Sequence, residues 1–119
     1  MKESRRQKKV ASLIKEVLGQ ILIDTVKDSF GSSLLTITQI AITKDLKTAH
    51  VYLSLLEKEH KEPILKMLDE RVGYFRKYIA SRTDLKYNPM LIFSYDPVLD
   101  YEEKIDALLD KIKNDEKSG

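Results

Sequence analysis

Two blocks of basic residues are the part of this sequence best suited to chemistry. Residues 1–9 carry five Lys or Arg against one Glu, and residues 71–86 carry five against one Asp. Such cations neutralise phosphates and release the counterions condensed on a nucleic acid, without recognising its base sequence. The residues expected to contact phosphates are Arg5, Arg6, Lys8, Lys9, Arg71, Arg76, Lys77, Arg82 and Lys86. A solvated charged face is the alternative, and two separate clusters favour nucleic acid over it.

Tyrosines accompany the second basic block. Tyr74, Tyr78 and Tyr87 lie within or just after it, and aromatic rings in RNA-binding proteins stack on unpaired bases. Tyr78 is equally expected to pack in the core, because its large ring can bury much apolar surface.

The sequence lacks the residue constellations on which catalysis depends. It holds no phosphate-binding glycine loop, no Gly-x-Ser-x-Gly and no histidine pair at metal-ligand spacing. His50 falls on a predicted strand and His60 in a predicted loop. Asp45 and Asp96 fall in predicted turns, where carboxylates accept local backbone hydrogen bonds. We therefore expect no enzymatic activity, no metal and no cofactor.

Length and composition limit the remaining classes of protein. A chain of 119 residues forms one ordinary domain, and the absence of cysteine excludes disulfides and thiolate metal sites. The longest apolar run spans only residues 90–93, far short of the roughly 20 that a membrane-spanning helix needs. Lys15 and Glu16 interrupt any apolar stretch of signal-peptide type. We expect a cytoplasmic protein without a membrane partner.

The first half of the chain predicts a helix followed by a β-hairpin. Apolar residues from Val10 to Leu22 follow helical spacing, Ser4 is suited to cap the helix, and its end is expected at about Val26. Residues 34–56 predict two strands joined by a turn at 44–47. The apolar positions of the first strand change parity, which indicates a β-bulge.

The second half predicts a broken helix and a third strand. One straight helix over 58–83 would place Arg71 and Arg82 close to its apolar stripe. A break near Gly73 and an end near Arg82 remove that conflict. The elements expected after it are a strand at 90–95, a turn at 96–97, and a helix at 101–114 with a frayed charged tail.

This order of elements predicts the fold class. The sequence α-β-β-α-α-β indicates an α+β domain of two layers, with the helices on one face of a three-stranded sheet and an added C-terminal helix. We expect the domain to span residues 1–98 and the C-terminal helix and tail to span 99–119. The tail segment is acidic, and a solubilising role is favoured for it over competition for the basic blocks.

Four segments in characteristic order carry a family resemblance. They are Arg6-Gln7-Lys8-Lys9-Val10, Thr43-Lys44-Asp45-Leu46 leading to Ala49-His50-Val51-Tyr52, Gly73-Tyr74-Phe75-Arg76, and Pro89-Met90-Leu91-Ile92-Phe93 leading to Tyr95-Asp96. Together, over residues 6–96, they resemble the ribosome-binding factor A family of bacterial ribosome assembly factors, which has a KH-like (type II) fold with a kinked helix pair.

The resemblance implies a function that the residue patterns alone do not give. It implies a non-catalytic protein that binds the immature small (30S) ribosomal subunit, contacts 16S rRNA and assists late maturation of the rRNA 5′ region. It also implies assembly GTPases acting on the same particles and a role in growth in the cold. We expect a monomer when free. The alternative is a generic RNA-binding or protein-interaction module of KH-like fold that does not act on ribosomes.

One segment departs from the family pattern. The family typically has Ala-x-Gly at the kink, where this chain has Arg71-Val72-Gly73. The long Arg71 side chain must then point outward or towards RNA, while Gly73 admits close approach of a nucleic-acid backbone. Gly73 and the turn lysines Lys44 and Lys47 complete the expected rRNA-binding residues.

Overall fold

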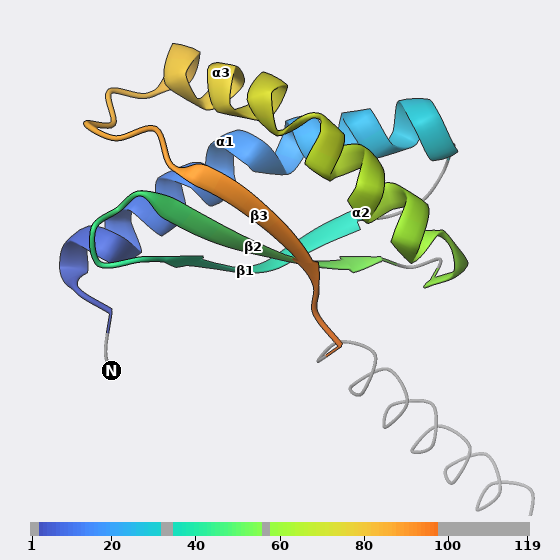
Figure 1. Cartoon of the computed structure of the whole chain (residues 1–119), viewed down its shortest axis with the longest axis horizontal. Coiled ribbons are helices and arrows are strands. Elements are labelled where there is room, and N and C mark those ends of the chain that lie inside the picture. The colour runs from blue at the N-terminus through green and yellow to red at the C-terminus, as the bar shows by residue number, and fades with distance from the viewer. Residues whose placement is uncertain (1–2, 32–34, 56–57, 98–119) are drawn as a thin grey trace, which may run out of the picture.

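The computed structural model describes residues 3–31, 35–55 and 58–97 (Figure 1). Its elements are α1 (Arg5–Phe30), β1 (Leu35–Ile42), β2 (Thr48–Leu55), a 3-10 turn (Lys58–His60), α2 (Lys61–Glu70), α3 (Val72–Arg82) and β3 (Met90–Tyr95). The predicted order α-β-β-α-α-β is confirmed. The helix and tail expected over 99–119 lie outside the described residues.

Helix α1 begins at the predicted cap and ends later than predicted. The Ser4 hydroxyl accepts the Gln7 backbone N–H at 3.1 Å, and the Gln7 side-chain oxygen accepts the Ser4 N–H at 2.8 Å. This reciprocal pair is a capping box. The end expected at about Val26 is wrong, because the helix continues to Phe30 and stops only at Gly31. Gly31 adopts a φ of 75°, a conformation that glycine reaches without steric cost.

The three strands form one mixed sheet in the order β1-β2-β3. Strands β1 and β2 are antiparallel, and β2 and β3 are parallel. The predicted bulge is confirmed, since the register shifts between Ile37, which faces Leu53, and Gln39, which faces Tyr52. Thr38 is therefore the extra residue, and the bulge brings apolar side chains on both sides of it to the same face.

The helical segment after the hairpin breaks at Arg71. This residue has φ −109° and ψ 15°, and its backbone N–H donates to the Leu68 carbonyl at 3.1 Å. Gly73 lies inside α3 without a positive φ, so its conformational freedom is not what makes the break. Arg71 and Arg82 are both exposed, as the predicted break requires.

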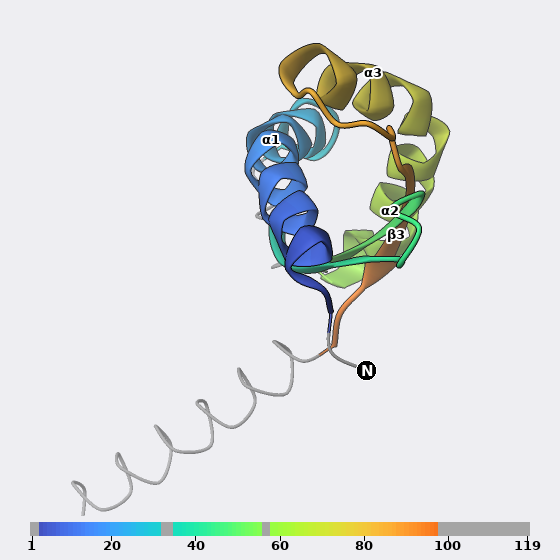
Figure 2. The same ribbon diagram turned by 90° about the vertical axis from the view of Figure 1, so that its left-hand side faces the viewer.

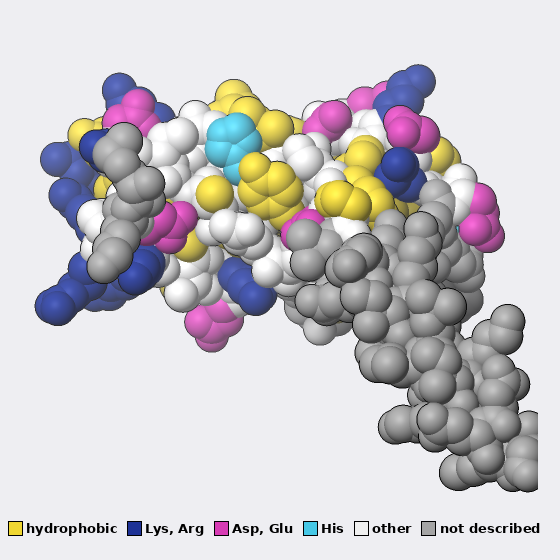
Figure 3. All heavy atoms as spheres, turned by 90° about the horizontal axis from the view of Figure 1, so that it is seen from below, with side chains coloured by type: hydrophobic (Ala, Val, Ile, Leu, Met, Phe, Trp, Pro, Cys, Tyr) yellow, Lys and Arg dark blue, Asp and Glu magenta, His cyan; other side chains and the backbone are white. Residues whose placement is uncertain are grey.

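The helices cover one face of the sheet and bury the core against it (Figures 1 and 2). Phe75 of α3 is fully buried, and its ring packs edge-on against that of Phe93, with 5.8 Å between the two ring centres. Leu18 of α1 and Leu68 of α2 are also fully buried. The opposite face of the sheet is open in Figure 3, which shows apolar and polar side chains side by side on it.

Candidate nucleic-acid interface

A buried hydrogen bond fixes the basic start of α1 against the sheet. The Gln7 side-chain Nε2 donates to the backbone carbonyl of Ile42, the last residue of β1, at 2.7 Å. A buried amide that keeps its partner holds position firmly, because losing the bond would leave a carbonyl unsatisfied. The exposed residues that this contact places beside the β1–β2 turn are Arg5, Arg6 and Lys9.

The β1–β2 turn is ordered by its own side chains and presents two lysines. The Asp45 carboxylate accepts the Thr43 hydroxyl at 2.7 Å and the Lys47 backbone N–H at 3.0 Å, and these two bonds lower the pKa of Asp45. Asp45 therefore acts as a turn residue, as predicted. Leu46 adopts a φ of 63° and is nevertheless buried. Lys44 and Lys47 project into solvent from this turn.

The loop between α3 and β3 is tied to its helix by Arg76. The Arg76 guanidinium donates to the carbonyls of Asn88 at 2.9 Å and Pro89 at 3.2 Å, and the Asn88 amide donates back to the Arg76 carbonyl at 3.1 Å. Arg76 thus holds the loop in place, besides any contact it makes with phosphate. Lys86 and Tyr87 lie exposed on the anchored loop.

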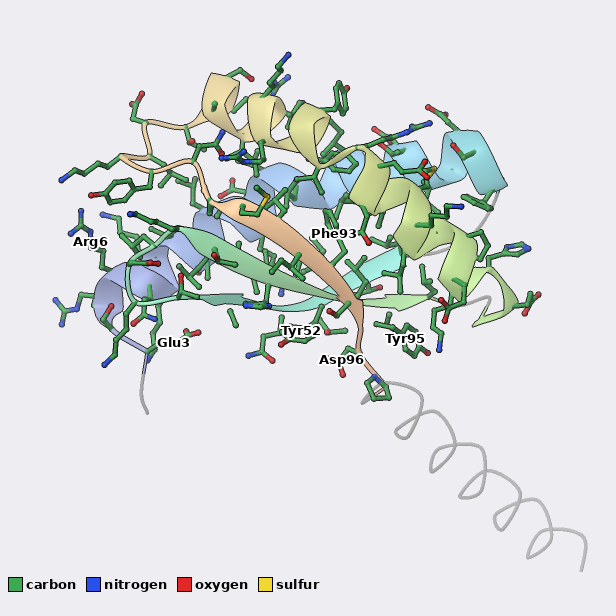
Figure 4. The ribbon with its side chains drawn as sticks, viewed as in Figure 1. Glu3, Arg6, Tyr52, Phe93, Tyr95 and Asp96 are labelled. Atoms are coloured by element: carbon green, nitrogen blue, oxygen red, sulfur yellow. The ribbon has the colours of Figure 1, made fainter. Side chains whose placement is uncertain are left out.

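These three segments, distant in sequence, meet at one end of the domain. A pocket of about 220 Å³ lies between them, lined by Arg6, Val10, Leu46, Asp84, Leu85, Lys86 and Tyr87. The ammonium groups of Lys47 and Lys86 lie 5.9 Å and 5.5 Å from the centre of the Tyr87 ring. Figure 2 looks onto this end, and Figure 4 shows Arg6 there, at the beginning of α1.

Cations gather at this end of the molecule, as Figure 3 shows. We call it the basic end, and it comprises Arg5, Arg6, Lys9, Lys44, Lys47 and Lys86. Its charges come from the first block, the turn and the last residue of the second block. The arrangement forms a surface for a polyanion, because several exposed cations can contact successive phosphates at once.

The other predicted residues lie elsewhere. Lys8 lines a second hollow with Glu3, Lys15 and Gln39, on the flank of α1 that faces the bulge. The Arg82 guanidinium lies 3.8 Å from the centre of the Tyr78 ring, which is half-buried against the core.

The remaining predicted residues stay with the helix pair. Arg71, Gly73 and Lys77 are exposed at and just after the break between α2 and α3. The structure therefore divides the twelve predicted contacts among the basic end, one flank of α1 and the helix pair. Leu46, Val10 and Leu85 were missed as lining residues, because apolar side chains in a turn, a helix and a loop carry no sequence signal of a shared pocket.

In the part of the chain that the structure describes, the side chains that could bind a metal ion do not cluster. No set of three or more His, Asp or Glu there is arranged to hold a metal ion. The Asp96 carboxylate accepts the hydroxyl of Thr38, a residue of the β1 bulge, at 2.5 Å. Figure 4 shows Asp96 just beyond β3, below the middle of the domain and well away from Arg6. No described helix is long and apolar enough to cross a membrane.

Comparison with known proteins identifies the family. The family model described as ribosome-binding factor A matches residues 6–109. The chain belongs to the ribosome-binding factor A family. A ribosome-binding factor A from Coxiella burnetii is 37% identical over 114 residues, with 95% of each chain covered. One from Dehalococcoides mccartyi is 33% identical over 110 residues, covering 92% of this chain and 93% of the relative.

Solved structures agree with the fold. A Thermotoga maritima protein described as a candidate ribosome binding factor A superposes with a TM-score of 0.61 at 28% identity, covering 79% of this chain and 90% of its own. The ribosome-binding factor A of Thermus thermophilus gives a TM-score of 0.63 at 23% identity, covering 75% and 94%. The KH-like α+β fold is thereby confirmed, and the ribosome-binding factor A family is one of non-enzymatic ribosome assembly factors.

Proposed function

We propose that this protein binds the immature small ribosomal subunit through its basic end, contacts 16S rRNA there and assists late maturation of the rRNA 5′ region in the cytoplasm. Family membership supports the general role, since it implies a factor in maturation of the 30S subunit. The position of the interface rests on one observation. Arg6, Lys47 and Lys86 come from three separate segments and meet around one pocket.

The physical basis of this binding is electrostatic. Each phosphate that a lysine or arginine neutralises releases counterions, so affinity falls steeply as salt rises. Binding of this kind shifts the folding of rRNA only if the protein has a higher affinity for one rRNA conformation than for another. The basic end suits that purpose, because hydrogen bonds hold the backbone segments that carry its cations in one arrangement, which matches some arrangements of phosphates better than others.

Co-sedimentation tests this proposal. The purified protein is centrifuged with immature small subunits, mature small subunits and large subunits. We expect salt-sensitive pelleting with small subunits, stronger for immature ones. A variant that reverses Arg6, Lys47 and Lys86 to Glu should remain in the supernatant, whereas Lys66→Glu, which reverses an exposed lysine on α2, should pellet normally. Equal pelleting of both variants would overturn the proposed interface.

The further partners stay predictions. Pull-down with assembly GTPases in the presence and absence of small subunits tests whether they meet this protein on the same particle. Light scattering of the free protein tests the expected monomeric state.

A further inference from the structure

We infer that the pocket at the basic end holds a single unpaired RNA base, stacked on Tyr87, with the flanking phosphates held by Lys47, Lys86 and Arg6. This inference rests on the proposed function and makes it more specific. It assigns to the basic end a preference for single-stranded over double-stranded RNA. Counterion release alone would not give that preference.

The lining of the pocket favours a base over a bare phosphate. Val10, Leu46 and Leu85 give it apolar walls, and Asp84 contributes a carboxylate. A carboxylate repels phosphate oxygens and can only accept hydrogen bonds, as from the N–H groups at a base edge. The volume of about 220 Å³ is below the roughly 300–1,000 Å³ typical of sites for larger ligands, so the pocket suits one small planar group.

Tyr87 is the ring best placed to receive that base. It is 40% exposed and lies in the pocket, with two ammonium groups near its ring. At 5.5 Å and 5.9 Å these contacts are near the outer limit of cation–π attraction, about 6 Å, so a base can replace them on the ring. The released ammonium groups then remain beside the phosphates that flank the stacked base.

The other two tyrosines lack this setting. The Tyr78 ring is half-buried, and the Arg82 guanidinium already lies over it, 3.8 Å from the ring centre. Tyr74 is 59% exposed, but its ring packs edge-on to Phe75 near the start of α3 and does not line the pocket. Tyr74 therefore serves as a matched control, since it is a surface tyrosine outside the pocket.

The strained backbone of Leu46 is further evidence that this pocket is a binding site. A leucine at φ 63° occupies a region that L-residues with branched side chains rarely adopt. Glycine or asparagine would fit this turn position without strain, and neither would cover the wall of the pocket. Strained backbone of this kind persists where the surroundings enforce it, and it clusters at binding sites.

Fluorescence anisotropy with a labelled single-stranded RNA and the corresponding duplex tests the inference. Base stacking on an aromatic ring is worth a factor of about 5 to 150 in affinity. We expect Tyr87→Ala to lose single-strand affinity by such a factor, while Tyr87→Phe and Tyr74→Ala retain it. Duplex affinity should be lower in the unaltered protein and independent of Tyr87.

A second measurement keeps the test decisive if Tyr87→Ala perturbs the fold. In the unaltered protein, NMR resonances of the Tyr87 ring should shift when the single strand is added and stay in place when the duplex is added. The inference would be overturned if the Tyr87 resonances did not change, or if the protein bound both RNAs with equal affinity. It would also be overturned if an acidic peptide bound the pocket and RNA did not. Salt-sensitive pelleting with small subunits would then leave the proposed function standing, whereas loss of that pelleting would overturn the proposed function itself.

Discussion

The Gln7 side-chain amide donates to the Ile42 backbone carbonyl at 2.7 Å, and this buried contact joins the start of α1 to the end of β1. It positions the basic first turns of α1 next to the β1–β2 turn. The spacing of Arg6 and Lys47 around the pocket therefore depends on a residue that carries no charge.

Replacing Gln7 with Ala should destabilise the protein without altering any charge. The Ile42 carbonyl would lose its buried partner, so the free energy of unfolding should fall by about 1–3 kcal/mol. Urea denaturation measures this change. Gln20→Ala is the control, because that amide only bonds Asp24 on the exposed face of the same helix. It should change stability by less than about 0.5 kcal/mol. Equal losses in both variants would contradict the structural role of Gln7.

At Leu46 the free-energy cost of a left-handed backbone opposes the free-energy gain from burying the side chain. The left-handed conformation costs roughly 1–2 kcal/mol, and burying a leucine side chain contributes about 1.5–3 kcal/mol, so burial prevails. Leu46→Ala should lose burial and keep the strain, whereas Leu46→Gly should lose burial and relieve the strain. We therefore expect the glycine variant to be the more stable of the two by about 1 kcal/mol in urea denaturation. A glycine variant less stable than the alanine variant would contradict this balance.

The pKa of Asp45 shows whether the hydrogen bonds that order the β1–β2 turn are formed. Hydrogen bonds from the Thr43 hydroxyl and the Lys47 backbone N–H favour the charged carboxylate and lower its pKa below the ordinary value of 3.8. Its stabilising contribution is complete above that ordinary pKa, and it is lost as pH falls through the lower pKa of the folded state. NMR titration should show Thr43→Val raising the pKa of Asp45 towards 3.8. Thr36→Val, on an exposed position of β1, should leave it in place.

Gly73→Ala should separate stability from binding. A Cβ at Gly73 would meet no atom within 4 Å, and the backbone there is helical. Because alanine favours helix over glycine, the free energy of unfolding should rise by up to about 1 kcal/mol. Gly73 lies on the helix pair, outside the basic end, so this variant tests it as a separate predicted rRNA contact. If RNA also contacts the helix pair, the added methyl group should obstruct close approach of its backbone and lower the affinity for the small subunit. Unchanged affinity in a filter-binding assay would place Gly73 outside the interface.

Local chemistry made much of the fold predictable. The parity change along β1 predicted a bulge in this strand, which the structure places at Thr38, and the conflict between Arg71 and the apolar stripe predicted the break between α2 and α3. The end of α1 was misplaced because residues beyond Val26 contain no helix breaker before Gly31, and Gly31 terminates the helix through its left-handed backbone.

The sequence predicted much less about how the interface residues are arranged in space. Charge counts identify basic blocks, but the pairing of β2 with β3 brings Lys47 and Lys86 together at the Tyr87 ring, and the Gln7 contact brings Arg6 beside the same turn. A charge count also cannot show that Arg76 is engaged by the carbonyls of Asn88 and Pro89. These arrangements depend on contacts between segments far apart in the chain.

The salt dependence of small-subunit binding tests the basic end most directly. Contact with about six phosphates predicts that log affinity falls with log salt at a slope of roughly −4 to −5. Reversing Arg6, Lys47 and Lys86 to Glu should make the slope shallower by roughly 2 to 3 and lower the affinity, because each lost phosphate contact removes close to one from the slope. Lys66→Glu should keep the original slope. A slope near zero for the unaltered protein, or an unchanged slope in the triple variant, would contradict binding through the basic end.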